Sequence, residues 1–274
     1  MPPLASPENL MTESASKLSL RISRRLSQHA FKQNLRLQGS TGIVCFTFDD
    51  APASACQTGA RILEQVGARG TFYIAGGLTG NSEQGKPCHT EADLRRLLAA
   101  GHELGCHSFS HVRCDTLTAK TLQDELDKNA AFLAQLGVDT GRLNFAYPFG
   151  AYAYQAKRIG STRFRSSRVT GGGLESGQVD LNALKTHRLY DVQVDTASVE
   201  TLITQAAQEH GWLIINTHDV EDSPSRYGIS PTRLEQVVAA ALAAGCKLMT
   251  MNEAIDYWQQ QEGADTKKVS ITGQ

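Results

Sequence analysis

The sequence predicts an α/β fold in which parallel strands alternate with helices and close into a barrel. Short apolar runs rich in β-branched and aromatic residues alternate with longer helical patterns after Gly39. Polar residues stand directly after several of these runs, as Asp49 and Asp50, His107 and His218 do. The 274 residues, 41% of them hydrophobic, suffice for one large core. Because the strands of an α/β barrel end at the same face, these distant polar residues are expected to converge there.

Each element of the barrel is predicted from its own pattern. Strands are expected at 43–48, 70–75, 103–106, 144–147 and 212–217, and helices at 53–66, 91–100, 118–136 and 231–244. The last helix leads through a glycine into a short apolar run at 247–251. Two loops, 171–177 and 224–230, contain the glycine and proline residues that are typical of flexible connections.

A helix is expected before the barrel, from Leu18 to about Leu37. Leu18, Ile22 and Leu26 recur at helical spacing, and basic residues occupy most of the rest of its surface. Such a basic amphipathic helix either covers the barrel or lies on a membrane surface. We favour the first interpretation. The chain is therefore divided into an N-terminal extension (1–40), a barrel domain (41–258) and a polar C-terminal tail (259–274).

Composition excludes several classes of protein. The 27 basic and 28 acidic residues give a formal charge of −1, which does not favour binding to nucleic acid. The six cysteines include no C-x-x-C pair, so we expect free thiols. The first residues lack the apolar segment of a secretion signal, and no apolar run is long enough to span a bilayer. A cytoplasmic location is expected, with the inner membrane face as the alternative.

Two histidines and two aspartates suggest a metal site. His107 and His111 are four residues apart, which would place both imidazoles on one face of a helical turn. Two histidines and one aspartate with an open position form a catalytic type of site, and Asp50 would complete it. Asp49 points elsewhere if the strand continues, because side chains alternate along a strand. A solvated Asp-Asp turn and two surface histidines are the structural alternative.

Two further strand ends carry groups that hydrolysis could use. Tyr147, Pro148 and Phe149 form a stiff loop that can direct a backbone N–H into a cleft, although a plain rigid turn has the same sequence. His218 follows a buried strand and could act as a general acid. A histidine bonded to the backbone at the edge of the core is the alternative.

Taken together, these segments resemble the polysaccharide deacetylase family with its NodB homology domain. The resemblance covers roughly residues 42–254 and implies a distorted (β/α) barrel of about seven parallel strands. The segments that carry it are Thr47-Phe48-Asp49-Asp50, Gly70-Thr71-Phe72-Tyr73, the run from Gly101 to His111, Tyr147-Pro148-Phe149-Gly150, Ile215-Asn216-Thr217-His218 and the closing stretch from Gly245 to Ala254.

The resemblance implies a role for each matching residue. The metal ligands would be Asp50, His107 and His111. Asp49 is similar to the general base of the family and His218 to its general acid. Within the substrate loop, Phe149 would offer its backbone N–H to the oxyanion, and Ile215 would lie near the acetyl methyl group.

Two departures from the family pattern stand out. Ala146 occupies the position at which many members carry an arginine that orients the base, and no Asp-x-x-Asp-Trp motif follows. A carboxylate base beside a divalent cation still needs a partner that keeps it from becoming a ligand. Arg165, Arg168 and Arg188 are the candidates, and Arg165 is preferred because it follows Phe164 in an expected strand. Ordinary surface arginines are the alternative.

The resemblance implies a metal-dependent hydrolase that removes the acetyl group from an N-acetylated sugar. Zinc is the expected ion, with Co²⁺, Ni²⁺ or Mn²⁺ as alternatives. The expected substrate is a nucleotide-linked sugar, a lipid-linked sugar or an oligosaccharide, and no nucleic acid partner is expected. A deformylase or amidase of the same superfamily and a catalytically silent glycan-binding barrel are the competing interpretations.

Overall fold

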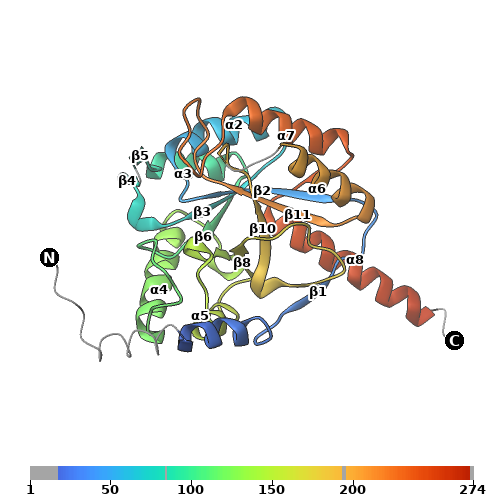
Figure 1. The fold of residues 1–274 in the computed structure, drawn as a ribbon, viewed down its shortest axis with the longest axis horizontal. Helices are drawn as coiled ribbons and strands as arrows, with labels where there is room; N and C mark the ends of the chain where they lie inside the picture. The colour runs from blue at the N-terminus through green and yellow to red at the C-terminus, as the bar shows by residue number, and fades with distance from the viewer. Residues whose placement is uncertain (1–17, 84, 193–195, 272–274) are drawn as a thin grey trace.

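Seven parallel strands close into a barrel, and helices surround it (Figure 1). The structure is a computed structural model that describes residues 18–83, 85–192 and 196–271. The ring closes where β11 pairs with β2 from Trp212–Ile43 to Thr217–Phe48, which confirms the predicted fold class. In ring order the strands are β2 (Ile43–Asp49), β3 (Thr71–Ile74), β6 (Glu103–Cys106), β7 (Asn144–Ala146), β8 (Ser166–Thr170), β10 (Leu184–Arg188) and β11 (Trp212–Thr217).

The central strand β2 is buried along its whole length, as its nearly continuous apolar sequence requires. Successive side chains of β2 pack alternately into two different apolar clusters. Val44 and Phe46 belong to the large cluster that includes residues of the surrounding helices. Ile43 and Cys45 belong to a second cluster inside the barrel, which also contains Trp212. β12 (Lys247–Leu248) adds a short parallel pairing at the start of β2.

The four helices that the sequence predicted in the barrel are present with ends that differ by a few residues, whereas α5, α6 and α8 were not predicted. Thr90 caps α3 with a capping box that includes Asp93, and Thr118 caps α4. The helices are α2 (Ala60–Gln65), α3 (Glu91–Ala99), α4 (Ala119–Gln135), α5 (Tyr154–Gly160), α6 (Thr196–Glu209), α7 (Pro231–Ala243) and α8 (Met251–Ile271), with a π-helical turn η1 (Ala55–Gly59) before α2 and 3₁₀ turns η2 (Gly76–Leu78), η3 (Thr140–Arg142), η4 (Pro148–Gly150) and η5 (Leu181–Ala183).

The helix of the N-terminal extension is shorter than predicted. It spans 18–27 and lies beside α5 (Figure 1), and β1 (Asn34–Arg36) follows it. β1 pairs antiparallel with β9 (Gln178–Asp180), so the backbone there is extended rather than helical. The predicted apolar stripe does not cover the barrel. Leu18, Ile22 and Leu26 are 59%, 52% and 56% exposed, because the helix contacts the rest of the chain through another face.

The extension also closes one end of the barrel. Leu35 and Leu37 pack with Val179 of β9 and with Ile255 and Trp258 of α8 against the apolar side chains inside the barrel. This plug lies at the end of the barrel where the strands begin, because Ile43 and Trp212, the first residues of β2 and β11, belong to the same cluster. The predicted C-terminal tail continues α8 as far as Ile271.

Three smaller features complete the fold. β4 (Ser82–Glu83) and β5 (Lys86–Pro87) form a short antiparallel ribbon. All six cysteines are free, as predicted, and the structure buries each of them. Across the described ranges, none of the helices combines the length and the apolar character that crossing a membrane demands.

Candidate metal and catalytic site

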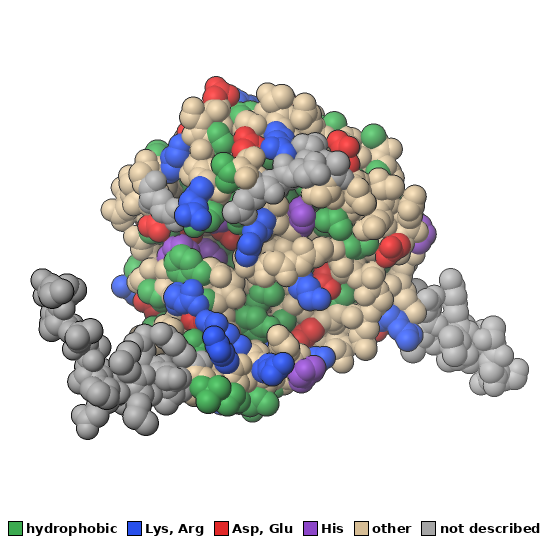
Figure 2. Space-filling view, viewed as in Figure 1, with side chains coloured by type: hydrophobic (Ala, Val, Ile, Leu, Met, Phe, Trp, Pro, Cys, Tyr) green, Lys and Arg blue, Asp and Glu red, His purple; other side chains and the backbone are tan. Residues whose placement is uncertain are grey.

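A cavity of about 280 Å³ opens at the end of the barrel where the strands finish. Histidine and acidic side chains gather in a hollow on this face (Figure 2). The position agrees with the general rule for α/β barrels, in which residues at the carboxyl ends of the strands build the site. The residues that line the cavity are Asp49, Asp50, His107, His111, Phe149, Thr170, Arg188, Tyr190, His218, Arg226 and Tyr227.

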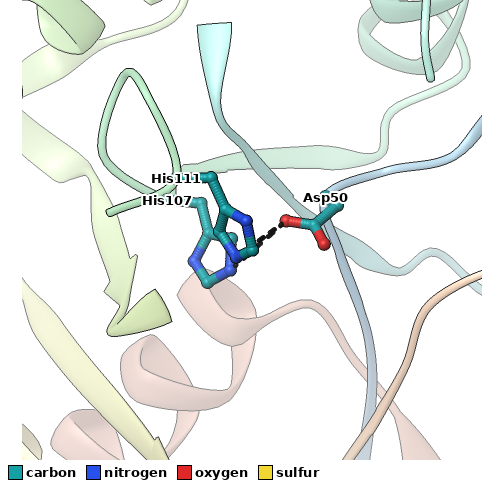
Figure 3. A group of neighbouring side chains, drawn as sticks. All are labelled: Asp50, His107 and His111. Atoms are coloured by element: carbon teal, nitrogen blue, oxygen red, sulfur yellow. Dashed lines mark ion pairs between the residues drawn. The ribbon is translucent and has the colours of Figure 1, made fainter. Parts of the chain in front are cut away.

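Asp50, His107 and His111 point toward one another (Figure 3). Their ligand atoms lie within 4.8 Å of one another, which is the spacing that a shared ion requires. Oδ1 of Asp50 is 3.3 Å from Nε2 of His111 and 3.6 Å from Nε2 of His107. This buried oxygen has no hydrogen-bond partner among the described residues. A carboxylate left in this state fits a cation.

The second ring nitrogen of each histidine is held by another group. Nδ1 of His107 donates to the carbonyl oxygen of Ala146 at 2.7 Å, and Nδ1 of His111 lies 3.5 Å from Oε1 of Glu83. Both contacts leave Nε2 directed at Asp50, the arrangement in which outer partners orient metal-binding imidazoles. Burial, with a smaller contribution from His111, holds the pKa of His107 well below its usual value. Burial also raises the pKa of Asp50 to about 6. The donor set therefore suits a divalent cation with nitrogen and oxygen ligands.

The predicted helical turn between the two histidines is wrong. Residues 107–111 form a loop in which Ser108 and His111 have positive φ angles of 57° and 50°. Asp50, at the end of β2, has φ of 60°, and Ala51 follows at 46°. Left-handed conformations in residues other than glycine cost about 1–3 kcal/mol each and often occur at functional sites. The two segments that carry the ligands thus have strained backbone conformations and are not part of a regular helix or strand.

Asp49 lines the same cavity as the triad and forms a buried ion pair with Arg168. The guanidinium group also lies over the ring of Tyr73, 4.2 Å from its centroid. Burial lowers the pKa of Arg168 to about 9, so this side chain remains charged at neutral pH. Asp49 is therefore a carboxylate that another group holds apart from the triad.

The preference for Arg165 is not supported by the geometry. Its guanidinium group contacts Asp256 and Asn252 of α8, on the outside of the barrel. Of the three candidates, Arg168 contacts Asp49, whereas Arg188 lies at the cavity and donates to Oγ1 of Thr170 at 3.2 Å. The reason is alternation along β8, because Arg168 enters the barrel beside Tyr73 and Arg165 precedes the strand.

His218 follows β11 and faces the triad from the other side of the cavity. Its Nε2 is 3.8 Å from Oδ2 of Asp50, and the rings of Tyr190 and Tyr227 lie at centroid distances of 5.7 and 5.3 Å. Burial, followed by the charges of Arg168 and His111, lowers the pKa of His218 to about 3. The imidazole is therefore neutral before any reaction begins.

The loop from Tyr147 to Gly150 brings only one of its predicted site residues to the cavity. Tyr147 and Pro148 are buried behind it, whereas Phe149 lines it, with its ring centroid 4.6 Å from that of His111. Phe149 has φ of 61° and Gly150 has φ of 62°. A Cβ on Gly150 would lie 2.3 Å from Oγ1 of Thr170, so this position requires glycine.

Ile215 is not placed at the cavity. It is fully buried in the cluster between the barrel and the helices, together with Leu213 on the same side of β11. Side chains alternate along a strand, so this side of β11 faces away from the barrel interior. The prediction that Ile215 lines an acetyl pocket is therefore corrected.

Several residues of the site were not predicted from the sequence. Glu83 lies before β5 and carries no motif, and Arg226 and Tyr227 lie in a loop that was recognised only by its proline and glycine. Thr170 is the last residue of β8 and Tyr190 lies two residues after β10, and the sequence did not define the end of either strand. Position at the end of a strand was the one signal that could have identified these two.

A closed parallel barrel thus holds a buried Asp-His-His triad and a second, separately held aspartate in one cavity. Residues 37–162 match the model of the polysaccharide deacetylase family. The chain is 35% identical over 78 residues to a chitin deacetylase of Colletotrichum lindemuthianum, which is 28% of this chain and 30% of the relative. It is 34% identical over 92 residues to a chitin disaccharide deacetylase of Vibrio alginolyticus, or 33% and 20% of the two chains.

Solved structures confirm the fold. PdaA of Bacillus subtilis, a family 4 carbohydrate esterase, matches with a TM-score of 0.56 at 16% identity, covering 85% of this chain and 88% of that one. An acetyl xylan esterase of Clostridium thermocellum in complex with cobalt matches with a TM-score of 0.55 at 19% identity, covering 77% and 89%. The family match over residues 37–162 confirms the resemblance to polysaccharide deacetylases, and the solved structures confirm the fold alone. The aligned segments span less than a third of the length of these curated relatives.

Proposed function

We propose that this protein is a metal-dependent hydrolase that removes the acetyl group from the nitrogen of an N-acetylated sugar. One observation carries the proposal: Asp49 is held by Arg168 directly beside the Asp50, His107 and His111 triad, within one cavity. Hydrolysis of an amide by a bound ion requires this pair of features, a cation site and a separate base. The match to polysaccharide deacetylases supports the choice of an N-acetylated carbohydrate.

Each residue then has a defined task. A divalent ion held by the triad would polarise the amide carbonyl and make water easier to deprotonate. Asp49 accepts the proton of the attacking water on the oxygen that Arg168 does not hold. Arg168 positions Asp49 and prevents it from becoming a fourth ligand. The backbone N–H of Phe149 hydrogen-bonds to the oxygen that becomes negative as the tetrahedral intermediate forms.

His218 assists departure of the amine. Because the imidazole is neutral at rest, it first has to gain a proton, and negative charge that accumulates in the cavity during attack raises its proton affinity. The proton that Asp49 takes from water is the source that balances the reaction. Nε2 of His218 can then donate to the leaving nitrogen, which would otherwise depart as an amide anion.

Zinc is the ion that we propose, because two imidazoles and one carboxylate are a frequent zinc set with an open position. Cobalt is an alternative ion that suits the same ligands, and the acetyl xylan esterase with a similar fold was solved with cobalt. Nickel and manganese remain alternatives.

Release of acetate from N-acetylated sugars tests the proposal. Protein loaded with zinc is incubated with a panel of N-acetyl sugars and with N-formyl analogues, and the released acid is measured. We expect acetate from at least one N-acetyl sugar, and loss of both metal content and activity in His111→Ala. Release of formate alone would replace the proposal with a deformylase, and binding without release of either acid would indicate a silent glycan-binding barrel.

We also propose that the helix at 18–27 contacts an anionic membrane surface, where a lipid-linked sugar would be presented. Its exposed stripe of Leu18, Ile22 and Leu26 is bordered by the exposed Arg21 and Arg25, a combination that suits anionic lipid headgroups. Sedimentation with anionic and neutral vesicles tests this, and Ile22→Ser should bind anionic vesicles less. Leu242→Ser removes an equally apolar exposed side chain on α7 and serves as the control. The cytoplasmic location stays a prediction.

A further inference from the structure

Three arginines lie at the cavity or border it, and they are in different electrostatic states. Arg168 is buried, and its charge is offset by Asp49. Arg188 and Arg226 line the cavity with exposed side chains. Within the part of the chain that the structure describes, no carboxylate forms an ion pair with either of them. Two positive charges in the cavity wall therefore face the space that a substrate would occupy.

Both guanidinium groups are positioned by neighbouring side chains that carry no charge. Arg188 donates to Oγ1 of Thr170 at 3.2 Å, and Arg226 lies over the ring of Tyr227, 4.8 Å from its centroid. These contacts use one of the five N–H donors of Arg188 and a face of the Arg226 guanidinium, so most donors of both remain available. Tyr227 also packs against His218, which places Arg226 next to the proposed acid.

The acidic groups near the cavity already have partners. Glu83 lies against His111, and Asp219 accepts hydrogen bonds from the backbone N–H and the Oγ of Ser225. Lys86 is already paired with Glu221. Asp50 and Glu83 thus carry negative charge at the triad, and Arg188 and Arg226 carry positive charge elsewhere in the cavity wall. A substrate with one negative group would be oriented by this asymmetry, whereas a neutral sugar would gain nothing from it.

We propose that Arg188 and Arg226 form a recognition site for a negatively charged substituent, a carboxylate or a phosphate, on the sugar that carries the N-acetyl group. Planar guanidinium groups bind both kinds of anion through paired hydrogen bonds. The inference rests on the proposed function for its reaction but not for its binding site. It narrows the substrate class from N-acetylated sugars in general to anionic ones.

Kinetics with three matched substrates test the specificity. The substrates are one N-acetyl amino sugar, the same sugar with a carboxylate substituent, and the same sugar with a phosphate. We expect kcat/KM to be highest for one or both anionic forms, and the ratio to the neutral form to fall about tenfold or more in Arg188→Met or Arg226→Met. The ratio should also fall as salt is added. Arg95→Met, at an exposed position on α3, is the matched control and should keep the wild-type ratio.

A binding measurement separates this inference from the proposed function. Inorganic phosphate is titrated into protein from which metal has been removed by a chelator, so that the anion can meet protein groups alone. Binding by the wild-type chain that is lost in the Arg188→Met/Arg226→Met double variant supports the inference, even if no sugar releases acetate. Equal kcat/KM for neutral and anionic substrates, together with no phosphate binding, overturns it, and acetate release would then still support the proposed function.

Discussion

Two buried carboxylates at opposite ends of the barrel show how differently the same group can be used. Glu103 begins β6, and it accepts hydrogen bonds from Asn144 at 2.6 Å, the backbone of Asn252 at 2.7 Å and Thr71 at 3.3 Å. Asp50 follows β2 at the other end, and its Oδ1 has no such partner among the described residues. Burial raises the pKa of both carboxyl groups. The loss of hydration at Glu103 is compensated by hydrogen bonds within the fold. At Asp50 it is not compensated, which leaves the oxygen available to a cation.

The backbone shows the same contrast. Five of the seven residues other than glycine with positive φ in the described chain lie around the cavity: Asp50, Ala51, Ser108, His111 and Phe149. The closed end of the barrel instead contains apolar side chains from β1, β9 and α8. Stability is therefore concentrated at the end where the strands begin, and the cost of preorganising ligands is concentrated where they finish.

The largest effect is expected at Asp49, whose carboxylate is paired with Arg168. Asp49→Asn removes the base but not a ligand, so turnover should fall by about 10² to 10⁴ while metal content stays the same. Steady-state kinetics and elemental analysis measure the two quantities on one sample. Loss of metal in this variant would mean that Asp49 is a ligand.

The effect of zinc on the free energy of unfolding should distinguish the end of the barrel at Asp50 from the end at Glu103. Addition of zinc at 100 times its dissociation constant should raise the free energy of unfolding of the wild-type chain by about 2.7 kcal/mol, because the ion binds the folded state alone. The variant Asp50→Asn should lose this increment, and Glu103→Ala should retain it. Denaturant titrations with and without zinc provide the values. An equal increment in all three proteins would place the ion elsewhere.

Glu103→Ala should destabilise the fold without affecting the site. The substitution leaves the donors of Asn144 and Asn252 without their acceptor, which costs about 1–3 kcal/mol. Zinc affinity, measured by competition with a coloured chelator, should stay at the wild-type value. A parallel loss of zinc affinity would show that the two ends of the barrel are coupled.

The smallest effect is expected at Phe149, where the backbone rather than the side chain is proposed to act. Phe149→Gly keeps the N–H and tolerates the positive φ, so it should be more stable than Phe149→Ala by about 1 kcal/mol. Its turnover should also exceed that of Asp49→Asn. Turnover as low as that of Asp49→Asn would instead assign the function to the aromatic ring that packs on His111.

The sequence predicted which residues build the triad better than how they reach it. His107 and His111 were identified by spacing, but four-residue spacing fits a helical turn and this strained loop equally well, and left-handed angles leave no signal in these residue types. Arg168 and Ile215 show a second limit. Which side of a strand faces the barrel interior depends on register with its neighbours, so Arg165 was preferred over Arg168 without a local reason to choose correctly.

Charge partners that come from distant loops were the least predictable. Glu83 and Arg226 reach the site from segments whose local sequence has no periodic pattern, and only the closed ring of strands brings them together. The barrel itself was predictable because β2 and β11 begin with apolar runs, as strands that are buried along their whole length require.

The plug formed by the N-terminal extension has a practical consequence for anyone who produces this protein in pieces. The family match begins at residue 37, yet Leu35 lies before that boundary and is 2% exposed within the barrel's inner cluster. An expression fragment that begins at residue 37 would open the inner cluster to solvent and invite aggregation. The region that matches the family and the region that folds thus begin at different residues. The shortest fragment that stays in solution should start upstream of β1.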